Sequence, residues 1–320
     1  MADAEPPNPD FRSWIVSNPD GTHTRVFNYP TVPPNSSSSL PVLTKDIQIN
    51  SANKTWLRIY LPRHLLDSSS SAANNRRLPL LLYFHGGGFV FFAADSTINH
   101  DFCVIMSQRI DAVVVSVEYR SAPEHRLPAA YDDAFEALQF IKSSQEDWLT
   151  QFADVSRCFL MGTSAGGNIA YHTGLRVCKS GRELEPLKVQ GLVLHHPFFG
   201  GLERTGSELK MGNNCGLPLD GTDFLWEYSL PVGSDRDHEY CNPMVSGLNK
   251  CQIIRESGLR VLVFGAYGDP MIDRQMGFAK MLEDNGVMNV AHFYEGTHGV
   301  EFIDSAKAEL MFCILIDFFL

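Results

Sequence analysis

The stretch Met161-Gly162-Thr163-Ser164-Ala165-Gly166-Gly167-Asn168 decides the fold of this chain. It follows Val155–Met161, an apolar run typical of a buried strand, and precedes Ile169–Val177, whose apolar positions are typical of a helix packed on a sheet. A Gly-x-Ser-x-Gly pattern at such a corner places the serine on a strained turn, with its hydroxyl pointing out of the sheet. Glycines two before and two after the serine let strand and helix approach closely. The pattern predicts that Ser164 is a nucleophile.

Three fixed positions can also match by chance, or can serve only a tight crossover, so the rest of the chain must decide. The tetrapeptide His85–Gly88 follows another apolar run, Leu78–Phe84, at the kind of strand end where ligands gather in α/β sheets. Consecutive glycines allow backbone N–H groups to converge on a developing negative charge. The alternatives are a flexible loop or a phosphate cradle, but no Gly-Lys-Ser/Thr follows. We expect an oxyanion hole made by the N–H groups of Gly87, Gly88 and Ala165.

A serine nucleophile requires a base and an orienting carboxylate. His298 lies in a glycine-flanked loop after the last expected strand, where the chain order Ser, Asp, His places the base. Asp269 directly follows a strand and is the preferred carboxylate, although an aspartate before proline is also a good helix N-cap. Asp273 is the alternative, in the first helical turn. Structural or packing roles are expected for three other histidines at strand ends: His85, His195 and His196.

Unbroken apolar runs alternate with helical patterns from end to end of the chain, which indicates a mostly parallel sheet covered on both faces. We therefore expect an α/β fold in a single domain, residues 1–320. The expected strands are Val42–Ile49, Thr55–Leu61, Leu78–Phe84, Ala112–Val117, Val155–Met161, Leu187–Leu194, Arg260–Gly265 and Val290–Tyr294.

Two segments interrupt this rhythm and are expected to form a small lid over the site. One is the arm at 1–40, with an apolar island at Phe11–Val16, and the other is an insertion at about 198–248 that is rich in aromatic residues. Aromatic and apolar residues near the expected site are candidates for a substrate pocket, with core packing as the alternative for each. They are Trp14, Phe89, Val90, Phe91, Phe198, Phe224 and Tyr228.

Composition limits the partners of the chain. Its 320 residues carry a net charge of -11 without any Lys/Arg-rich run, which argues against a nucleic-acid surface and favours a small neutral or cationic partner. The seven cysteines are scattered and never form a Cys-x-x-Cys pair, so we expect free thiols rather than a disulfide framework or a zinc site, and no metal is expected. The start, Met1–Pro7, is acidic and proline-rich, unlike a signal or transit peptide, and no apolar window is long enough to span a membrane. A cytoplasmic location is expected; the oligomeric state stays open.

Taken together, these motifs resemble the hormone-sensitive-lipase-like group of the α/β-hydrolases, and within it the plant carboxylesterases. The stretches Val117–Asp133 and Asp235–Pro243 carry the resemblance further. It implies an eight-stranded sheet, a lid from the arm and the insertion, and hydrolysis of short-chain or specialised-metabolite esters through an acyl-enzyme without a cofactor. The chain departs from the group's pattern at Thr163, where an acidic residue is usual, and at Ser121, where leucine is usual.

The resemblance also implies alternatives to ester hydrolysis. Gibberellin receptors share the fold but have replaced the catalytic histidine, so His298 argues against a hormone-binding role. Other members are dehydratases, lyases or cyclases of specialised metabolism, or act on alkaloid intermediates such as methyl esters, and these can retain much of the triad. The sequence leaves the natural substrate undetermined.

Overall fold

A computed structural model describes residues 10–26, 29–37, 39–67, 76–212 and 216–320. The acidic start of the chain lies outside these ranges. No helix among the described residues has both the length and the apolar character that crossing a bilayer requires.

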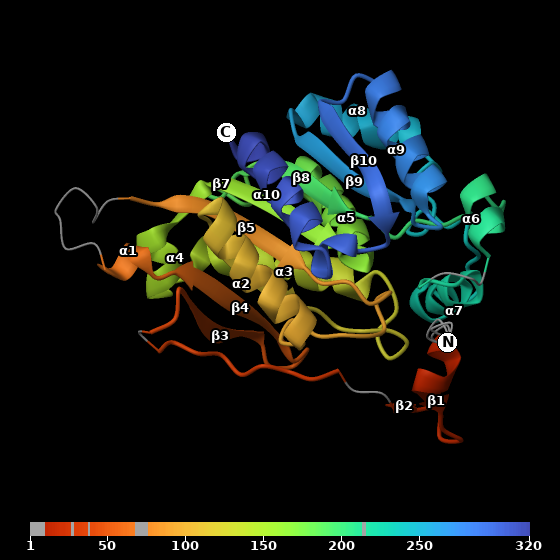
Figure 1. Ribbon diagram of the computed structural model, residues 1–320, viewed down its shortest axis with the longest axis horizontal. Helices are drawn as coiled ribbons and strands as arrows, with labels where there is room; N and C mark the ends of the chain where they lie inside the picture. Colours follow the sequence, from red (N-terminus) through yellow and green to blue (C-terminus); the bar gives the residue numbers. More distant parts are fainter. Residues whose placement is uncertain (1–9, 27–28, 38, 68–75, 213–215) are drawn as a thin grey trace, which may run out of the picture.

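An eight-stranded sheet forms the centre of the molecule (Figure 1), in the order β10-β9-β8-β7-β5-β6-β4-β3. The strands from β5 to β10 are parallel to one another, whereas β4 runs antiparallel to both of its neighbours, β6 and β3. Each of the eight expected runs is a strand, which confirms the mostly parallel sheet. The bounds are β3 Val42–Asn50, β4 Thr55–Pro62, β5 Leu78–Phe84, β6 Val113–Glu118, β7 Ala153–Thr163, β8 Val189–His195, β9 Arg260–Gly268 and β10 Asn289–Thr297.

Helices cover both faces of this sheet because its strands are apolar on both sides. Along β5, Leu80 and Leu82 belong to one buried cluster and Leu81 and Tyr83 to the other, as the two-residue period of a strand requires. The first cluster includes residues of α3 (Ala129–Ser143), α4 (Asp147–Phe152), α5 (Ala165–Lys179), α8 (Gly247–Ser257) and α9 (Ile272–Asp284), and the second includes residues of α2 (Thr97–Ile110) and α10 (Ser305–Phe319). A short helix, α1 (His64–Asp67), follows β4.

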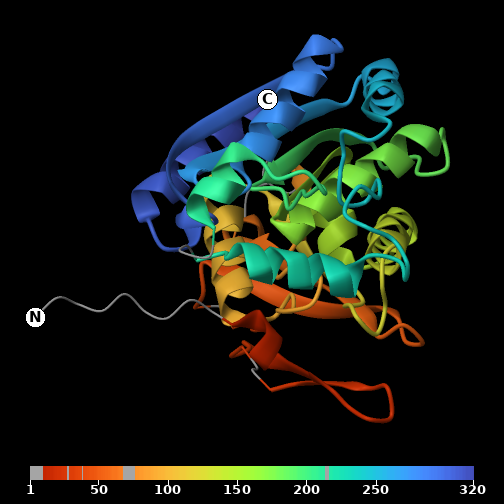
Figure 2. The ribbon, with the colours of Figure 1, turned by 90° about the vertical axis from the view of Figure 1, so that its right-hand side faces the viewer.

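The N-terminal arm and the insertion meet beside the sheet. The arm contains η1 (Phe11–Trp14) and the two-stranded sheet of β1 (Ile15–Ser17) and β2 (His23–Arg25), and the insertion contains α6 (Gly206–Met211) and α7 (Leu219–Ser229). Figure 2 shows the red arm alongside α7. The Arg12 guanidinium lies 5.2 Å from the Phe224 ring centre, and Ser17 Oγ lies 3.2 Å from the Tyr228 hydroxyl. The two segments therefore pack as one cap, while the single-domain division stays a prediction.

Candidate active site

Ser164 lies on a sharp turn between β7 and α5. Its backbone is in a strained region, with φ 56° and ψ -118°. A Cβ at Gly162 would lie 2.0 Å from the Gly166 carbonyl oxygen, and one at Gly166 would lie 1.9 Å from the Phe84 carbonyl oxygen. Strand and helix therefore approach too closely for any larger side chain at either position. The geometry matches the turn that the sequence pattern predicts.

His298 and Asp269 follow the neighbouring strands β10 and β9, so both lie at the carboxyl edge of the sheet. His298 Nδ1 is 2.7 Å from Asp269 Oδ2, and the Asp269 side chain is fully buried. The Met271 N–H donates to Asp269 Oδ1 and the Gln275 amide donates to Oδ2, each at 2.9 Å. Burial raises the pKa of Asp269, but the facing imidazoles outweigh it and hold that pKa well below its ordinary value. Asp269 is thus an ionised partner for the imidazole.

Asp273, the alternative carboxylate, has a different environment. Its Oδ2 accepts a hydrogen bond of 2.7 Å from the Ser207 N–H at the start of α6. It therefore joins α6 to α9, whereas Asp269 contacts His298.

The glycine loop after β5 forms a tight turn. Two of its positions can be occupied only by glycine. Gly87 has φ +104° and Gly88 has φ +61°. A Cβ at Gly87 would lie 2.0 Å from the Phe91 carbonyl oxygen, and one at Gly88 would lie 2.5 Å from the Leu225 side chain. Both glycines line the same cavity as Ser164, next to Ala165 at the start of α5. The loop is therefore fixed in shape beside the serine, as an oxyanion hole requires.

His85 lies beneath this loop and packs against it. Its Nδ1 is 2.8 Å from the Gly86 carbonyl oxygen, and its ring stacks on Tyr119 with 4.3 Å between ring centres. Burial lowers the pKa of His85 to about 4, so the ring is neutral. A neutral, buried and stacked imidazole is suited to ordering the loop.

A cavity of about 440 Å³ joins these groups. Ser164, His298 and the three loop glycines line one side of it. Among the described residues that line it, none is Asp, Glu, Lys or Arg. The other walls are mainly aromatic, with contributions from Phe11, Trp14, Tyr29, Phe91, Phe92 and Phe198. The cavity is therefore apolar and suited to an uncharged ligand.

Of the seven pocket candidates, Trp14, Phe91 and Phe198 line the cavity. The other four do not, which corrects the prediction for them. The Phe89 backbone has φ +66° and directs its ring against Phe198 and Trp226, and Val90 beside it is buried. The last two lie on α7 and pack against the arm: Phe224 beneath Arg12, and Tyr228 against Ser17.

Sequence reasoning missed several residues that line the cavity. Phe11 stands in the apolar island of the arm and Leu225 in the aromatic segment of the insertion, so each had a local signal. Tyr29, Phe92 and Phe302 had no such signal in the sequence, because the direction of their side chains depends on how the cap packs over the sheet.

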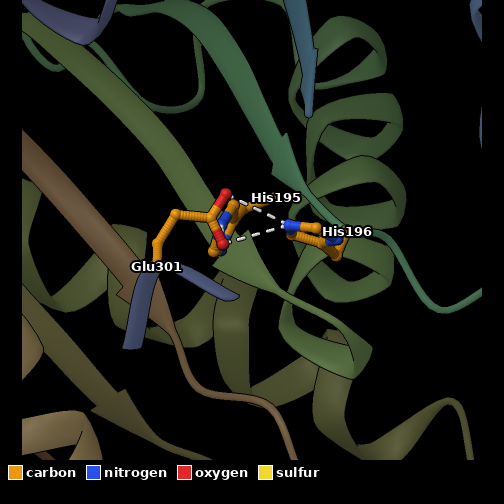
Figure 3. Close-up of side chains that lie close together, drawn as sticks. All are labelled: His195, His196 and Glu301. Atoms are coloured by element: carbon orange, nitrogen blue, oxygen red, sulfur yellow. Dashed lines mark hydrogen bonds and ion pairs between the residues drawn. The ribbon is translucent and has the colours of Figure 1, made fainter. Parts of the chain in front are cut away.

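A second group of polar side chains lies next to Asp269. His195 ends β8, His196 directly follows it, and Glu301 lies in η3 (Val300–Phe302), with the three side chains close together (Figure 3); all three are buried. His196 Nδ1 is 3.4 Å from Asp269 Oδ2, so His196 contacts the candidate triad. A structural role for this histidine stays a prediction, and its contact with Asp269 is the feature that the sequence did not indicate.

The same side chains include donor sets that could hold a metal ion. Within the described part of the chain, two such groups have ligand atoms no more than 4.8 Å apart: His195 with His196 and Glu301, and His196 with Asp269 and His298. His196 already has a hydrogen-bond contact with Glu301, and His298 has one with Asp269, so protons can occupy these positions between nitrogen and carboxylate oxygen.

Comparison with known proteins shows the family to which this chain is related. Residues 81–301 match a family described as having the alpha/beta hydrolase fold. Carboxylesterase 20 of Arabidopsis thaliana is 46% identical over 309 residues, covering 95% of this chain and 94% of the relative. A 3-O-acetylpapaveroxine carboxylesterase of Papaver somniferum, CXE2, is 47% identical over 315 residues, covering 94% and 96%.

Among solved structures, an esterase of Pyrobaculum calidifontis superimposes with a TM-score of 0.70 at 27% identity, covering 85% of this chain and 84% of its own. Sequence, fold and relatives thus agree. The chain belongs to the α/β-hydrolase family and, within it, to the plant carboxylesterases, which are carboxylic ester hydrolases.

Proposed function

We propose that this carboxylesterase works through Ser164, His298 and Asp269. The observation that carries the proposal is the 2.7 Å contact between His298 Nδ1 and the buried Asp269 carboxylate. It leaves the other ring nitrogen, Nε2, free to act as the base. His298 and Ser164 line one cavity, and the serine lies on a strained turn that presents its hydroxyl.

The reaction has two halves that use the same groups. Ser164 Oγ attacks the ester carbonyl carbon while His298 Nε2 takes the hydroxyl proton. The N–H groups of Gly87, Gly88 and Ala165 stabilise the oxyanion of the tetrahedral intermediate. When the C–O bond breaks, His298 returns the proton to the leaving alcohol and an acyl-serine remains. A water molecule, deprotonated by His298, then attacks the acyl carbon, and Ser164 recovers its proton as the acid leaves.

The substrates that fit are uncharged esters with a bulky apolar group, because the cavity walls are mainly aromatic and carry no Asp, Glu, Lys or Arg among the described residues. The arm and α7 together cap this cavity and act as its lid. The opium-poppy relative is named for an acetylated compound, 3-O-acetylpapaveroxine. Acetyl esters of large aromatic alcohols are therefore the first candidates, with alkaloid methyl esters as the second.

Labelling with paraoxon tests the nucleophile. Stoichiometric modification at Ser164, found by peptide mapping, should abolish turnover of p-nitrophenyl acetate and butyrate. Ser164→Ala should lose both labelling and turnover, whereas Ser156→Ala, at an exposed serine of β7, should keep both. Absence of labelling in the folded protein would contradict the proposal and favour a lyase, a cyclase or a non-catalytic receptor on this fold.

A further inference from the structure

The candidate triad continues into a buried chain of polar groups on the side of Asp269 away from the cavity. One oxygen, Asp269 Oδ2, lies 2.7 Å from His298 Nδ1 and 3.4 Å from His196 Nδ1. On the far side of its ring, His196 Nε2 lies 3.1 and 3.2 Å from the two oxygens of Glu301 (Figure 3). His196 and Asp269 are fully buried and Glu301 is 3% exposed. Two imidazoles therefore share one carboxylate, and a second carboxylate holds the inner imidazole.

Close contacts also lead from Glu301 to the residue before the nucleophile, although His195 Nε2 makes no hydrogen bond of good geometry with a described residue. His195 Nε2 lies 3.0 Å from Glu301 Oε2, and His195 Nδ1 lies 2.8 Å from Thr163 Oγ1. The Tyr83 hydroxyl donates to that same Thr163 oxygen at 2.9 Å. Thr163 occupies the position at which the hormone-sensitive-lipase-like group usually has an acidic residue. In this chain Glu301 brings a buried carboxylate within reach of that position through His195.

The charges on the chain follow from its contacts. Burial by itself lowers the pKa of His196, but hydrogen bonds and charge interactions with Asp269 and Glu301 outweigh it and raise that pKa to about 9. For His195, burial dominates and lowers the pKa, so this ring is neutral. Burial also opposes ionisation of Glu301, yet the facing histidines hold its pKa well below the ordinary range. A cation, His196, thus lies between two carboxylates.

We propose that His196 and Glu301 are positioning residues of the triad: Glu301 keeps His196 protonated, and this buried cation shares Asp269 with His298 so that His298 remains an unprotonated base. The proposal rests on the catalytic roles assigned above. The rings of His196 and His298 are 5.5 Å apart between centres. A positive charge at that distance in a buried site opposes a second one, so the cation disfavours protonation of His298.

The charge balance depends on every titratable group around His196. On β8 the neighbour is His195; the loops after β9 and β10 contribute Asp269 and His298; and η3 contributes Glu301. The Tyr294 ring of β10 lies 6.4 Å away. On its other side Glu301 lines an apolar surface pocket together with Tyr29 and Asp101. The facing groups are His195, Glu301, Asp269, His298 and Tyr294, with Tyr29 and Asp101 beyond Glu301.

Nitrogen NMR of the wild-type protein labelled with ¹⁵N-histidine tests the charge without any need for activity, so its failure is separate from failure of the proposed function. His196→Gln assigns the signal. At pH 7.5 both nitrogens of His196 should carry protons and titrate near pH 9, whereas His195 should be neutral. A neutral His196 at pH 7.5 would overturn the proposal, as would stoichiometric zinc in the purified protein, because a metal ion would take the place of the proton.

The pH profile of kcat/KM for p-nitrophenyl acetate tests the effect on the base. Glu301→Gln and His196→Gln should each move the acid limb up by about one pH unit, because each removes the cation beside Asp269. The double variant should match Glu301→Gln, since that substitution has already removed the same charge. An unchanged limb, or a downward shift in Glu301→Gln, would overturn the proposal.

A matched control separates this effect from loss of stability. Asp133 is a carboxylate on α3 that is 1% exposed and lies 2.7 Å from Arg120 Nη2. Asp133→Asn should lower the melting temperature because it breaks a buried ion pair. It should leave the acid limb where it is in the wild type; an equal shift in this variant would show that the limb reports stability, and would count against the proposal.

Discussion

Arg25 and Glu124 form a two-pronged ion pair that joins the N-terminal arm to the loop after β6. The guanidinium nitrogens lie 2.8 and 2.9 Å from the two carboxylate oxygens. The same guanidinium donates to the carbonyl oxygens of Val90, at 2.9 Å, and Ala122, at 2.6 Å. The side chains are only partly exposed, at 26% and 37%. Arg25 thus holds the N-terminal arm against Val90, which follows the glycine loop in the chain.

Arg25→Ala should loosen the arm and with it the cavity wall that Phe11 and Trp14 provide. We expect a bulky substrate to reach this wall and a small one not to, so KM should rise roughly fivefold for 1-naphthyl butyrate and change less than about twofold for p-nitrophenyl acetate. Steady-state kinetics with both esters measure this difference. The exposed pair of Arg182 with Glu185 supplies the control, Arg182→Ala, which should match the wild type. Equal changes for both esters in Arg25→Ala would exclude an arm-specific effect.

The close approach of β7 and α5 predicts opposite outcomes for two glycine substitutions. In Gly162→Ala the new Cβ would lie 2.0 Å from the Gly166 carbonyl oxygen. In Gly277→Ala, on α9, no neighbouring heavy atom would lie within 4 Å of the new Cβ. Gly162→Ala should lower the melting temperature by at least about 5 °C and reduce esterase activity, because buried backbone must move. Gly277→Ala should raise stability by about 0.5–1 kcal/mol, as alanine favours a helix interior. Thermal unfolding and p-nitrophenyl acetate turnover measure both; a tolerated Gly162→Ala would contradict the steric account of the turn.

The sheet and the three catalytic candidates could be predicted because their signals are local. Parallel strands covered on both faces must be apolar at nearly every position, as Leu78–Phe84 is, so each strand is visible as a continuous run. The nucleophile turn and the glycine loop each fit within eight residues. The order of the chain then leaves His298 after the last strand.

The contact between His196 and Glu301 could not be predicted in this way. The two residues are 105 positions apart and meet because His196 follows β8 and η3 follows β10, and these parallel strands end at the same edge of the sheet. The direction of an aromatic side chain is also not determined by its local sequence. Phe89 is beside the glycine loop, but its positive φ turns the ring toward Trp226 in the insertion. Both features arise from packing between distant elements.

The environment of Glu118 predicts that the folding stability of the protein depends on pH. This residue ends β6, accepts a 2.6 Å hydrogen bond from the Ala94 N–H, and lies 3.7 Å from His85 Nε2. Burial raises the pKa of Glu118 to about 8. Between the unfolded pKa of 4.5 and the folded pKa of about 8, the folded state binds more protons than the unfolded state. The stabilisation that this group contributes is therefore complete below pH 4.5 and is lost as the pH rises through 8.

Glu118→Gln should remove this contribution, because glutamine does not titrate. The difference in melting temperature between variant and wild type should therefore move in favour of the variant from pH 5 to pH 8.5. Taking the difference cancels the other titrating groups. Glu309→Gln, at a half-exposed carboxylate of α10 that pairs with Arg109, supplies the control. A constant difference for Glu118→Gln would mean that Glu118 titrates in the folded protein as it does in the unfolded chain.

Two aromatic residues of the cap should affect different properties. Trp14 lines the cavity, whereas Phe224 is 2% exposed, packs on Tyr228 at 4.4 Å between ring centres, and does not line it. Trp14→Ala removes apolar surface that a bulky ester contacts, so kcat/KM for 1-naphthyl butyrate should fall roughly tenfold, mainly through KM, while p-nitrophenyl acetate changes less than about threefold.

Phe224→Ala should instead leave an unfilled space between α7 and the arm. The expected cost is about 3 kcal/mol of folding stability, with kcat/KM for both esters close to wild type after the folded fraction is taken into account. Kinetics and thermal unfolding of the two variants, measured side by side, separate the roles. If Phe224→Ala instead lost naphthyl ester turnover at unchanged stability, its ring would have to contact the substrate. The cap would then adopt a different packing when a substrate is bound.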